Sequence, residues 1–231
     1  MDSTFWELMR SVDTPTVCNA IEVVQGKRGF SGFTKGTVLA AVPDLGAICG
    51  YARTARIAAA IAAKEPPEVV RARRMDYYRH MASGGSPRIA VVEDVDFPAC
   101  VGAFWGEVNT TVHKGFGLEG TLTNGVMRDL GDLAEGFQVI AGSIGPSHAF
   151  VHVTQVGGAV EVFGLRVEDG DLVHADRHGA VVIPPDVIEH LATAIETMRK
   201  AENLILQPAR QPGFDIEAFE IAWRAFEEAR T

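Results

Sequence analysis

Residues 102–132 read GAFWGEVNTTVHKGFGLEGTLTNGVMRDLGD, and this stretch decides the fold. It divides into a glycine-bearing loop, a helix, a glycine-rich helix end and a strand. The expected bounds are 101–106 for the loop, about 105–114 for the helix, 115–120 for its end and 121–123 for the strand. The apolar run RIAVVE at residues 88–93 predicts a buried strand before this stretch. A helix between two strands at this spacing is typical of a βαβ unit and favours parallel pairing.

Outside this unit the chain alternates β-like and helical patterns. Residues 13–24 predict a capped amphipathic helix, residues 38–63 are β-like, and residues 65–82 predict a helix that starts at a double proline. Further short strands are expected at 137–141, 151–156, 159–163, 171–175 and 180–183, and helices at 186–205 and 215–229. The basic residues of the helix at 65–82, Arg71, Arg73 and Arg74, are interpreted as a solvated face.

These patterns predict a single α/β domain over residues 1–231, ending in a helical extension of about 186–231. The last helix carries several apolar side chains, and we expect it to pack on a neighbouring subunit. These side chains are Ile216, Phe219, Ile221, Trp223 and Phe226.

The composition argues against several classes of protein. With 47% apolar and 22% charged residues, the chain resembles an ordinary globular protein. Its net charge of −9 disfavours a nucleic-acid partner, because an acidic surface repels phosphates. No run approaches the roughly 18 apolar residues of a membrane span, and residues 1–10 do not resemble a secretory signal, so we expect a cytoplasmic protein with no membrane partner. Cys18, Cys49 and Cys100 lack the spacing of a disulfide framework or a cysteine zinc site.

Three features of residues 102–132 carry chemistry. The small residues of the loop before the helix let backbone N–H groups approach an anion, which the positive end of the helix dipole favours. Arg128 can bind a carboxylate or stabilise an enolate oxygen, and the adjacent Asp129 can hold a hard cation such as Mg²⁺. Asp132 shares a face with Asp129 if a helix begins at Asp129. A second interpretation stays open, in which Asp129 is an N-cap, Asp132 its N3 residue and Arg128 part of a surface ion pair.

The histidines are weaker candidates. His174 and His178, with Asp176 between them, resemble a metal site, but the surrounding glycines favour a strand and a tight turn, so we do not expect one. His148 and His152 are interpreted as core or turn residues, and Cys18 as a small buried filler.

The segments GAFWGE, GTLTNGVMRDLGD and GDLVHADRHGAVVIP resemble the RraA-like proteins. This family includes the 4-hydroxy-4-methyl-2-oxoglutarate/4-carboxy-4-hydroxy-2-oxoadipate aldolases and the RraA regulators of ribonuclease activity. The resemblance runs from TPTVCNAIE at residues 14–22 to Pro184, and it implies a layered β/β/α swivelling-type fold. The aldolase branch has an acidic residue, twenty intervening positions, Arg-Asp, two positions and a final acid, which match Glu107, Arg128, Asp129 and Asp132. The chain departs from this branch at Asn124, where the family often has Asp, and at Glu107, where characterised aldolases have Asp.

The resemblance implies a site for a small anionic 2-oxo acid and one Mg²⁺ or Mn²⁺, held by Asp129 and by waters that Glu107 and Asp132 bind. Arg128 would reach the 2-oxo oxygen, so that C–C cleavage or loss of CO₂ from oxaloacetate leaves a pyruvate enolate. The substrate carboxylate would lie against the backbone amides of Gly102, Ala103, Phe104, Trp105 and Gly106.

The resemblance also implies a homotrimer or homohexamer with the site between subunits, where Glu202 would reach a neighbour's site. One alternative is a non-catalytic RraA-like regulator that binds a ribonuclease or helicase. Another is a lyase of this fold for a different hydroxy or keto acid. Glu107 and Asp132 favour an enzyme, because a binding module does not need carboxylates that position water around Asp129.

Overall fold

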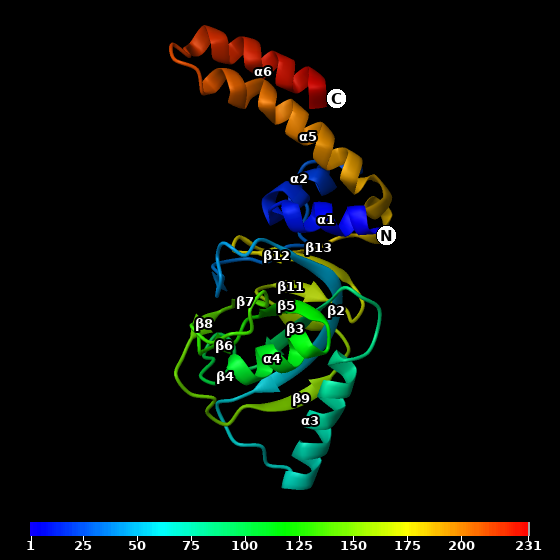
Figure 1. Cartoon of the computed structure of the whole chain (residues 1–231), viewed down its shortest axis with the longest axis vertical. Helices are drawn as coiled ribbons and strands as arrows, with labels where there is room; N and C mark the ends of the chain where they lie inside the picture. Colours follow the sequence, from blue (N-terminus) through cyan, green and yellow to red (C-terminus); the bar gives the residue numbers. More distant parts are fainter. Residues whose placement is uncertain (231) are drawn as a thin grey trace. The chain divides into compact units, whose positions relative to one another are not determined.

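The computed structural model describes residues 1–230 and groups them into two compact units (Figure 1). The first unit contains residues 1–15 and 31–183, and the second contains residues 16–30 and the chain from Pro184 onward. The last residue of the domain predicted over 1–231 lies outside the described residues. The role of the C-terminal helices at a subunit interface stays a prediction.

The first unit holds all the strands of the described chain, together with three helices and the start of a fourth. The helices are α1 (Ser3–Ser11), the start of α2 (Thr14–Gln25), α3 (Pro67–Met81) and α4 (Glu107–Gly115). The strands are β1 (Leu39–Ala40), β2 (Ile48–Ala58), β3 (Arg88–Asp94), β4 (Ala103–Trp105), β5 (Leu118–Thr123), β6 (Val126–Met127), β7 (Gln138–Ala141), β8 (Ser143–Ile144), β9 (His152–Val156), β10 (Val160–Val162), β11 (Leu165–Val167), β12 (Leu172–Asp176) and β13 (Gly179–Val182).

The main sheet is mixed. Its strand order is β1-β7-β5-β3-β2-β12-β13, and β9 also pairs with β2. The central strands β2, β3, β5 and β7 are parallel to their neighbours in this series, whereas β1, β9, β12 and β13 pair antiparallel. A smaller parallel sheet has the order β4-β6-β8, and β10 and β11 form a separate antiparallel ribbon.

Side chains on the two faces of the main sheet form two apolar cores. Along β3, Ile89 and Val91 pack in the core that includes the β10–β11 ribbon, whereas Ala90 and Val92 pack in the core with Tyr77 of α3. Successive residues of a strand point to opposite faces, so a strand buried on both faces is apolar at nearly every position. This explains the continuous run at residues 88–93 and gives the sheet covering layers on both sides.

The second unit is helical. It contains most of α2, the short 3₁₀ helix η1 (Pro185–Val187), α5 (Ile188–Ala209) and α6 (Ile216–Arg230). The rings of Phe219, Trp223 and Phe226 contact one another along α6, with centroid distances of 5.6 and 5.4 Å. Ile216 and Ile221 on the same helix are 67% and 64% exposed. No helix among residues 1–230 combines the length and the apolar character needed to cross a bilayer.

The predicted layered α/β fold with C-terminal helices is confirmed. So are the parallel pairing of β3 with β5 and the helix expected at 65–82, which is α3. The loop expected over 101–106 is wrong for residues 103–105, which form β4, and the following helix begins at Glu107 rather than near Trp105. No element was expected at α1, β6, β8 or β11.

Candidate active site

The predicted site residues follow two neighbouring parallel strands. Gly106 and Glu107 come directly after β4, and Arg128 and Asp129 come directly after β6. The backbone N–H of Arg128 donates to the carbonyl of Trp105 (2.8 Å), which extends the pairing beyond β6. Because the carboxyl ends of parallel strands meet at one edge of a sheet, residues 22 positions apart in sequence lie together there.

Asp129 is held in place through one of its carboxylate oxygens. Its Oδ2 accepts a hydrogen bond from the Glu107 backbone N–H (3.2 Å) and lies 3.3 Å from Arg128 Nε. Oδ1 has no hydrogen-bond partner among residues 1–230. The backbone of Asp129 is left-handed, with φ of 56°, a conformation that costs on the order of 1 kcal/mol even though aspartate tolerates it better than most residues. The fold therefore keeps Asp129 in a strained conformation that brings its carboxylate to the N-terminal end of α4, where the helix dipole favours a negative charge.

Close approach is the reason for glycine at position 106. A Cβ added to Gly106 would overlap Asp129 Oδ2 and would lie 3.0 Å from Arg128 Cγ. The φ of Gly106 is −150°, which any residue can adopt, so the backbone conformation does not require glycine. Gly106 therefore provides the space in which the Asp129 carboxylate lies.

The backbone N–H groups of Glu107 and Asp132 both donate to Asp129. Glu107 is the first residue of α4, and the Asp132 N–H donates to the Asp129 carbonyl (2.9 Å) in a turn. Both are exposed, and neither carboxylate has a hydrogen-bond partner in residues 1–230. The N-cap interpretation is wrong, because residues 129–132 form a turn and no helix begins there; the Asp129 side chain instead accepts from the first N–H of α4.

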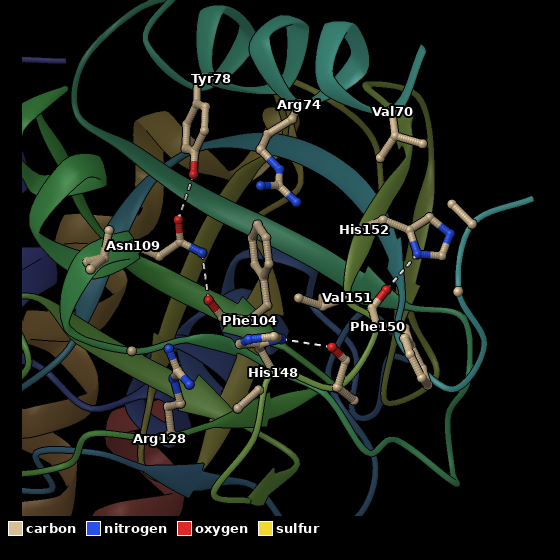
Figure 2. A pocket seen from close by; sticks show the side chains of 16 residues that line it. Val70, Arg74, Tyr78, Phe104, Asn109, Arg128, His148, Phe150, Val151 and His152 are labelled. Carbon is tan, nitrogen blue, oxygen red and sulfur yellow. Dashed lines mark hydrogen bonds between the residues drawn. The ribbon is translucent and has the colours of Figure 1, made fainter. Parts of the chain in front are cut away.

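A pocket of about 440 Å³ opens beside these residues, and Gly106 and Arg128 form part of its wall (Figure 2). Of the predicted substrate-binding residues, Ala103, Phe104 and Gly106 line the pocket, whereas Gly102 and Trp105 do not. Gly102 is buried against Ala59 and the His148 carbonyl. The Ala103 N–H already donates to the Ser147 carbonyl (2.9 Å), so this amide is not available to a substrate as predicted. The lining residues are Ala62, Ala63, Val70, Arg74, Tyr78, Ala103, Phe104, Gly106, Val108, Asn109, Arg128, His148, Ala149, Phe150, Val151 and His152.

Helix α3 supplies a wall that the sequence analysis missed. Arg74 and Tyr78 project from α3 toward the pocket in Figure 2, so interpreting Arg74 as part of a solvated face was incomplete. The Tyr78 hydroxyl donates to Asn109 Oδ1 (3.0 Å), and Asn109 Nδ2 donates to the Phe104 carbonyl (2.6 Å). Burial raises the pKa of Tyr78, so this hydroxyl stays protonated and acts as a donor. The chain of hydrogen bonds fixes the α3 side of the pocket to β4.

Two histidines also line the pocket: His148 lies at the turn before β9, as one of its two interpretations expected, and His152 is the first residue of β9. Neither is a buried core residue. His148 Nδ1 lies 2.7 Å from the Ala149 carbonyl, and His152 Nδ1 lies 2.8 Å from the Phe150 carbonyl. A carbonyl only accepts, so each Nδ1 carries a proton and each Nε2 is left for a ligand. Ala149 has a φ of 45°, a strained conformation in the turn that carries His148.

The ring nitrogens of His174 and one of His178 have partners within the protein. His174 Nδ1 contacts Thr14 Oγ1 (3.0 Å) and its Nε2 contacts the Met9 carbonyl (2.8 Å), so both ring nitrogens are already used. His178 Nδ1 pairs instead with Asp176 Oδ2 (3.1 Å) in the β12–β13 hairpin. The strand and tight turn expected here are confirmed. Within residues 1–230, no group of three or more His, Cys, Asp or Glu side chains is arranged to hold a metal ion.

The donor chemistry at Asp129 fits a divalent cation of the Mg²⁺ type. Such ions prefer oxygen ligands, keep several waters and often bind through only one or two carboxylates. Asp129 offers one unpartnered oxygen, the Glu107 backbone N–H donates to its other oxygen, and the exposed Asp132 lies three residues after it. These residues therefore suit an ion that is held mainly by Asp129 and water.

Asn124 occupies a structural position rather than the pocket. Its Oδ1 accepts from the Asp94 N–H (2.7 Å), and its Nδ2 donates to the Asp94 carbonyl (3.2 Å). An amide provides both the acceptor and the donor, so Asn124 ties the ends of β3 and β5 together. The Asp94 side chain is buried, and burial raises its pKa.

Comparison with curated proteins found a relative in Methanocaldococcus jannaschii, the uncharacterized protein MJ0644. The two sequences are 32% identical over 111 residues, which is 46% of this chain and 53% of the relative. The chain thus spans about half the length of the curated protein that it matches.

Solved structures share the fold. One solved structure is described as that of novel cellulases from microbes associated with the gut ecosystem. It has a TM-score of 0.69 and 17% sequence identity to this protein, over 88% of this chain and 87% of that chain. Streptomyces coelicolor RraAS2, described as an unusual member of the RNase ES inhibitor RraA protein family, has a TM-score of 0.65 and 20% identity, over 87% of this chain and 96% of that one. At these identities the likeness concerns the fold alone.

The sequence model of the RraA-like family, described as Aldolase/RraA, matches residues 14–182. The match covers most of the chain and includes both strands that lead into the site. It confirms the resemblance that the segments around Arg128 and His174 indicated. The chain belongs to the RraA-like family, whose members include both lyases and RNase inhibitors.

Proposed function

We propose that the protein is a divalent-metal-dependent lyase that cleaves a C–C bond of a 2-oxo acid through a pyruvate enolate. One observation carries the proposal: a carboxylate with one unpartnered oxygen and the guanidinium of the adjacent arginine meet at the carboxyl ends of β4 and β6, next to a pocket. This is the place where open α/β sheets bind ligands. Arg128 lines the pocket itself, so it can contact a bound acid.

Arg128 has two tasks in this site. Its Nε stays close to Asp129, and its terminal nitrogens remain available to the pocket, because no other acceptor for them exists in residues 1–230. A guanidinium directed at the 2-oxo oxygen stabilises the negative charge that develops there as the C–C bond breaks. Gly106 lines the pocket at the N-terminal end of α4, where the helix dipole favours the substrate carboxylate.

Glu107 and Asp132 are the proton carriers of the proposal. Cleavage requires that a proton leave the C4 hydroxyl and that another reach C3 of the enolate. The Glu107 backbone N–H donates to the Asp129 carboxylate, Asp132 lies in the turn that follows Asp129, and both carboxylates are exposed, so each can accept a proton directly or through a water. A divalent cation held by Asp129 would supply Lewis-acid polarisation of the 2-oxo group.

The test is pyruvate release from oxaloacetate and from 4-hydroxy-4-methyl-2-oxoglutarate, first with Mg²⁺ and then with excess chelator. We expect release that the chelator abolishes and that Asp129→Ala lowers by at least about 100-fold, since loss of a group that stabilises transition-state charge costs 10²–10³ in rate. Asp44→Ala is the matched control, because that carboxylate is 97% exposed and does not line the pocket. Activity that persists with chelator, or in Asp129→Ala, overturns the proposal.

A second candidate is a non-catalytic regulator. Its support is the fold shared with RraAS2, whose description places that protein in an RNase-inhibitor family. The exposed carboxylates of Glu107 and Asp132, whose backbones contact Asp129, favour a lyase, because a surface that only docks a protein gains nothing from them. Failure to release pyruvate from either substrate with Mg²⁺ or Mn²⁺ would favour the regulator.

A further inference from the structure

The pocket is cationic in an acidic protein. Two arginines, Arg74 and Arg128, and two histidines line it, and no Asp or Glu of residues 1–230 does so. The chain as a whole carries a net charge of −9. The Asp129 carboxylate that pairs with Arg128 Nε lies outside the lining, so the wall of the pocket itself carries positive charge, which attracts anions and raises their local concentration.

The two arginines enter the pocket from different elements. Arg128 follows β6, whereas Arg74 projects from α3, and Figure 2 shows their guanidinium groups on different sides of the Phe104 ring. In the proposed reaction Arg128 is occupied with the pyruvate half of the substrate. Arg74 is therefore left for a different part of the same molecule.

Arg74 differs from its neighbours on α3. Val70, Arg74 and Tyr78 are spaced four residues apart, so they share the helix face that lines the pocket. Arg73 points elsewhere and pairs with Glu65. The Arg74 guanidinium, by contrast, makes no hydrogen bond or ion pair with residues 1–230. A guanidinium offers planar, two-pronged binding to a carboxylate, so Arg74 is suited to a second anionic group.

The wall of the pocket is otherwise largely apolar. Phe104 and Val151 are half-buried, Phe150 and Val108 are more exposed, and Ala62, Ala63 and Ala149 complete this surface. Apolar walls stabilise an apolar body through its removal from water. A pocket of about 440 Å³ falls within the size range of small-molecule sites.

We infer that the fragment released from the substrate has an apolar, aryl-sized body with an anionic group at its far end, and that Arg74 is the specificity-determining residue for that group. This inference rests on the proposed function. In the reaction the C3–C4 bond breaks, the C4 hydroxyl loses its proton to become an aldehyde, and the electron pair stays with the pyruvate half, which is protonated at C3. Arg74 contacts only the aldehyde half.

The experiment compares two substrates that differ by one charge: 4-(4-carboxyphenyl)-4-hydroxy-2-oxobutanoate and 4-hydroxy-2-oxo-4-phenylbutanoate. The full chain with Mg²⁺ should cleave the carboxylated substrate with a kcat/KM roughly 10- to 100-fold higher, as expected for one charge-assisted contact. Arg74→Met should remove this preference by lowering only the value for the carboxylated substrate. Arg74→Lys should retain part of it, and Arg71→Met, on the same helix but outside the pocket lining, should change neither value.

A second readout separates the two proposals. Exchange of the pyruvate methyl protons with deuterium, followed by NMR, needs the pyruvate half of the site but not Arg74. Normal exchange in the wild type and in Arg74→Met, with the charge preference lost in the variant, is the expected result. Normal exchange with no charge preference in the wild type, or with a preference that survives Arg74→Met, overturns the inference and leaves the proposed function in place. No exchange in the wild type with Mg²⁺ overturns the proposed function itself.

Discussion

Replacing Gly106 by alanine should remove activity while leaving the fold intact. The added Cβ would overlap Asp129 Oδ2 and would lie 3.0 and 3.1 Å from Cγ and Nε of Arg128. Since non-bonded carbon contacts are normally about 3.5 Å or longer, the Asp129 carboxylate must move by about 1 Å. That movement breaks its hydrogen bond with the Glu107 N–H and separates it from Arg128.

The effect on rate should be much larger than the effect on stability. A misplacement of about 1 Å in a reacting constellation costs on the order of 100-fold in rate. The hydrogen bond and the ion pair at Asp129 are about one-third exposed, so their loss should lower the free energy of unfolding by only about 1 kcal/mol. Alanine also fits the extended backbone at this position, because its φ is −150°.

The assay is Mg²⁺-dependent pyruvate release, with urea unfolding measured on the same samples. Gly115→Ala is the matched control: it lies in the same helix, and its Cβ would meet nothing within 4 Å. We expect the control to keep full activity and to gain up to about 1 kcal/mol of stability from helix propensity. Full activity in Gly106→Ala would refute the idea that the position of Asp129 controls the reaction.

Two further predictions concern stability. Burial lowers the pKa of His113 to about 4, so between pH 6.5 and 4 the unfolded chain binds a proton at this residue that the folded chain does not. The free energy of unfolding should therefore fall by about 1.4 kcal/mol per pH unit as the pH drops through that window. Urea unfolding at a series of pH values should show a weaker dependence of this free energy on pH in His113→Asn. Asn124→Asp should destabilise the protein by about 1–3 kcal/mol, because it replaces the donor to the Asp94 carbonyl with an anion beside a buried carboxyl group; an unchanged urea midpoint would show that the amide is not needed.

The strands that could be predicted from the sequence are those with enough residues to show a pattern. β3 is buried on both faces and is therefore a nearly continuous apolar run, whereas β5 (LEGTLT) is mostly polar and was expected only over residues 121–123. β4 and β6 contain three and two residues, which is too few for any periodicity, so the glycines around β4 predict a loop there. These short strands nevertheless bring Glu107 and Asp129 together.

The sequence predicts one side of the candidate site and not the other. Arg128 and Asp129 are adjacent and fit a family pattern, so they could be proposed directly. Arg74 and His148 reach the same pocket from α3 and from the turn before β9, and only tertiary packing unites segments so far apart in sequence. The four-residue spacing of Val70, Arg74 and Tyr78 was the available signal, but a spacing alone does not show what the helix face covers.

The central claim is that Asp129 holds one divalent cation at the edge of the pocket. Titration of the full chain with Mn²⁺, followed by the electron paramagnetic resonance signal of the free ion, tests it without reference to any substrate. We expect Asp129→Asn to lose the site that the wild type and the control Asp44→Asn retain. Equal binding of Mn²⁺ by Asp129→Asn and the wild type would contradict the claim.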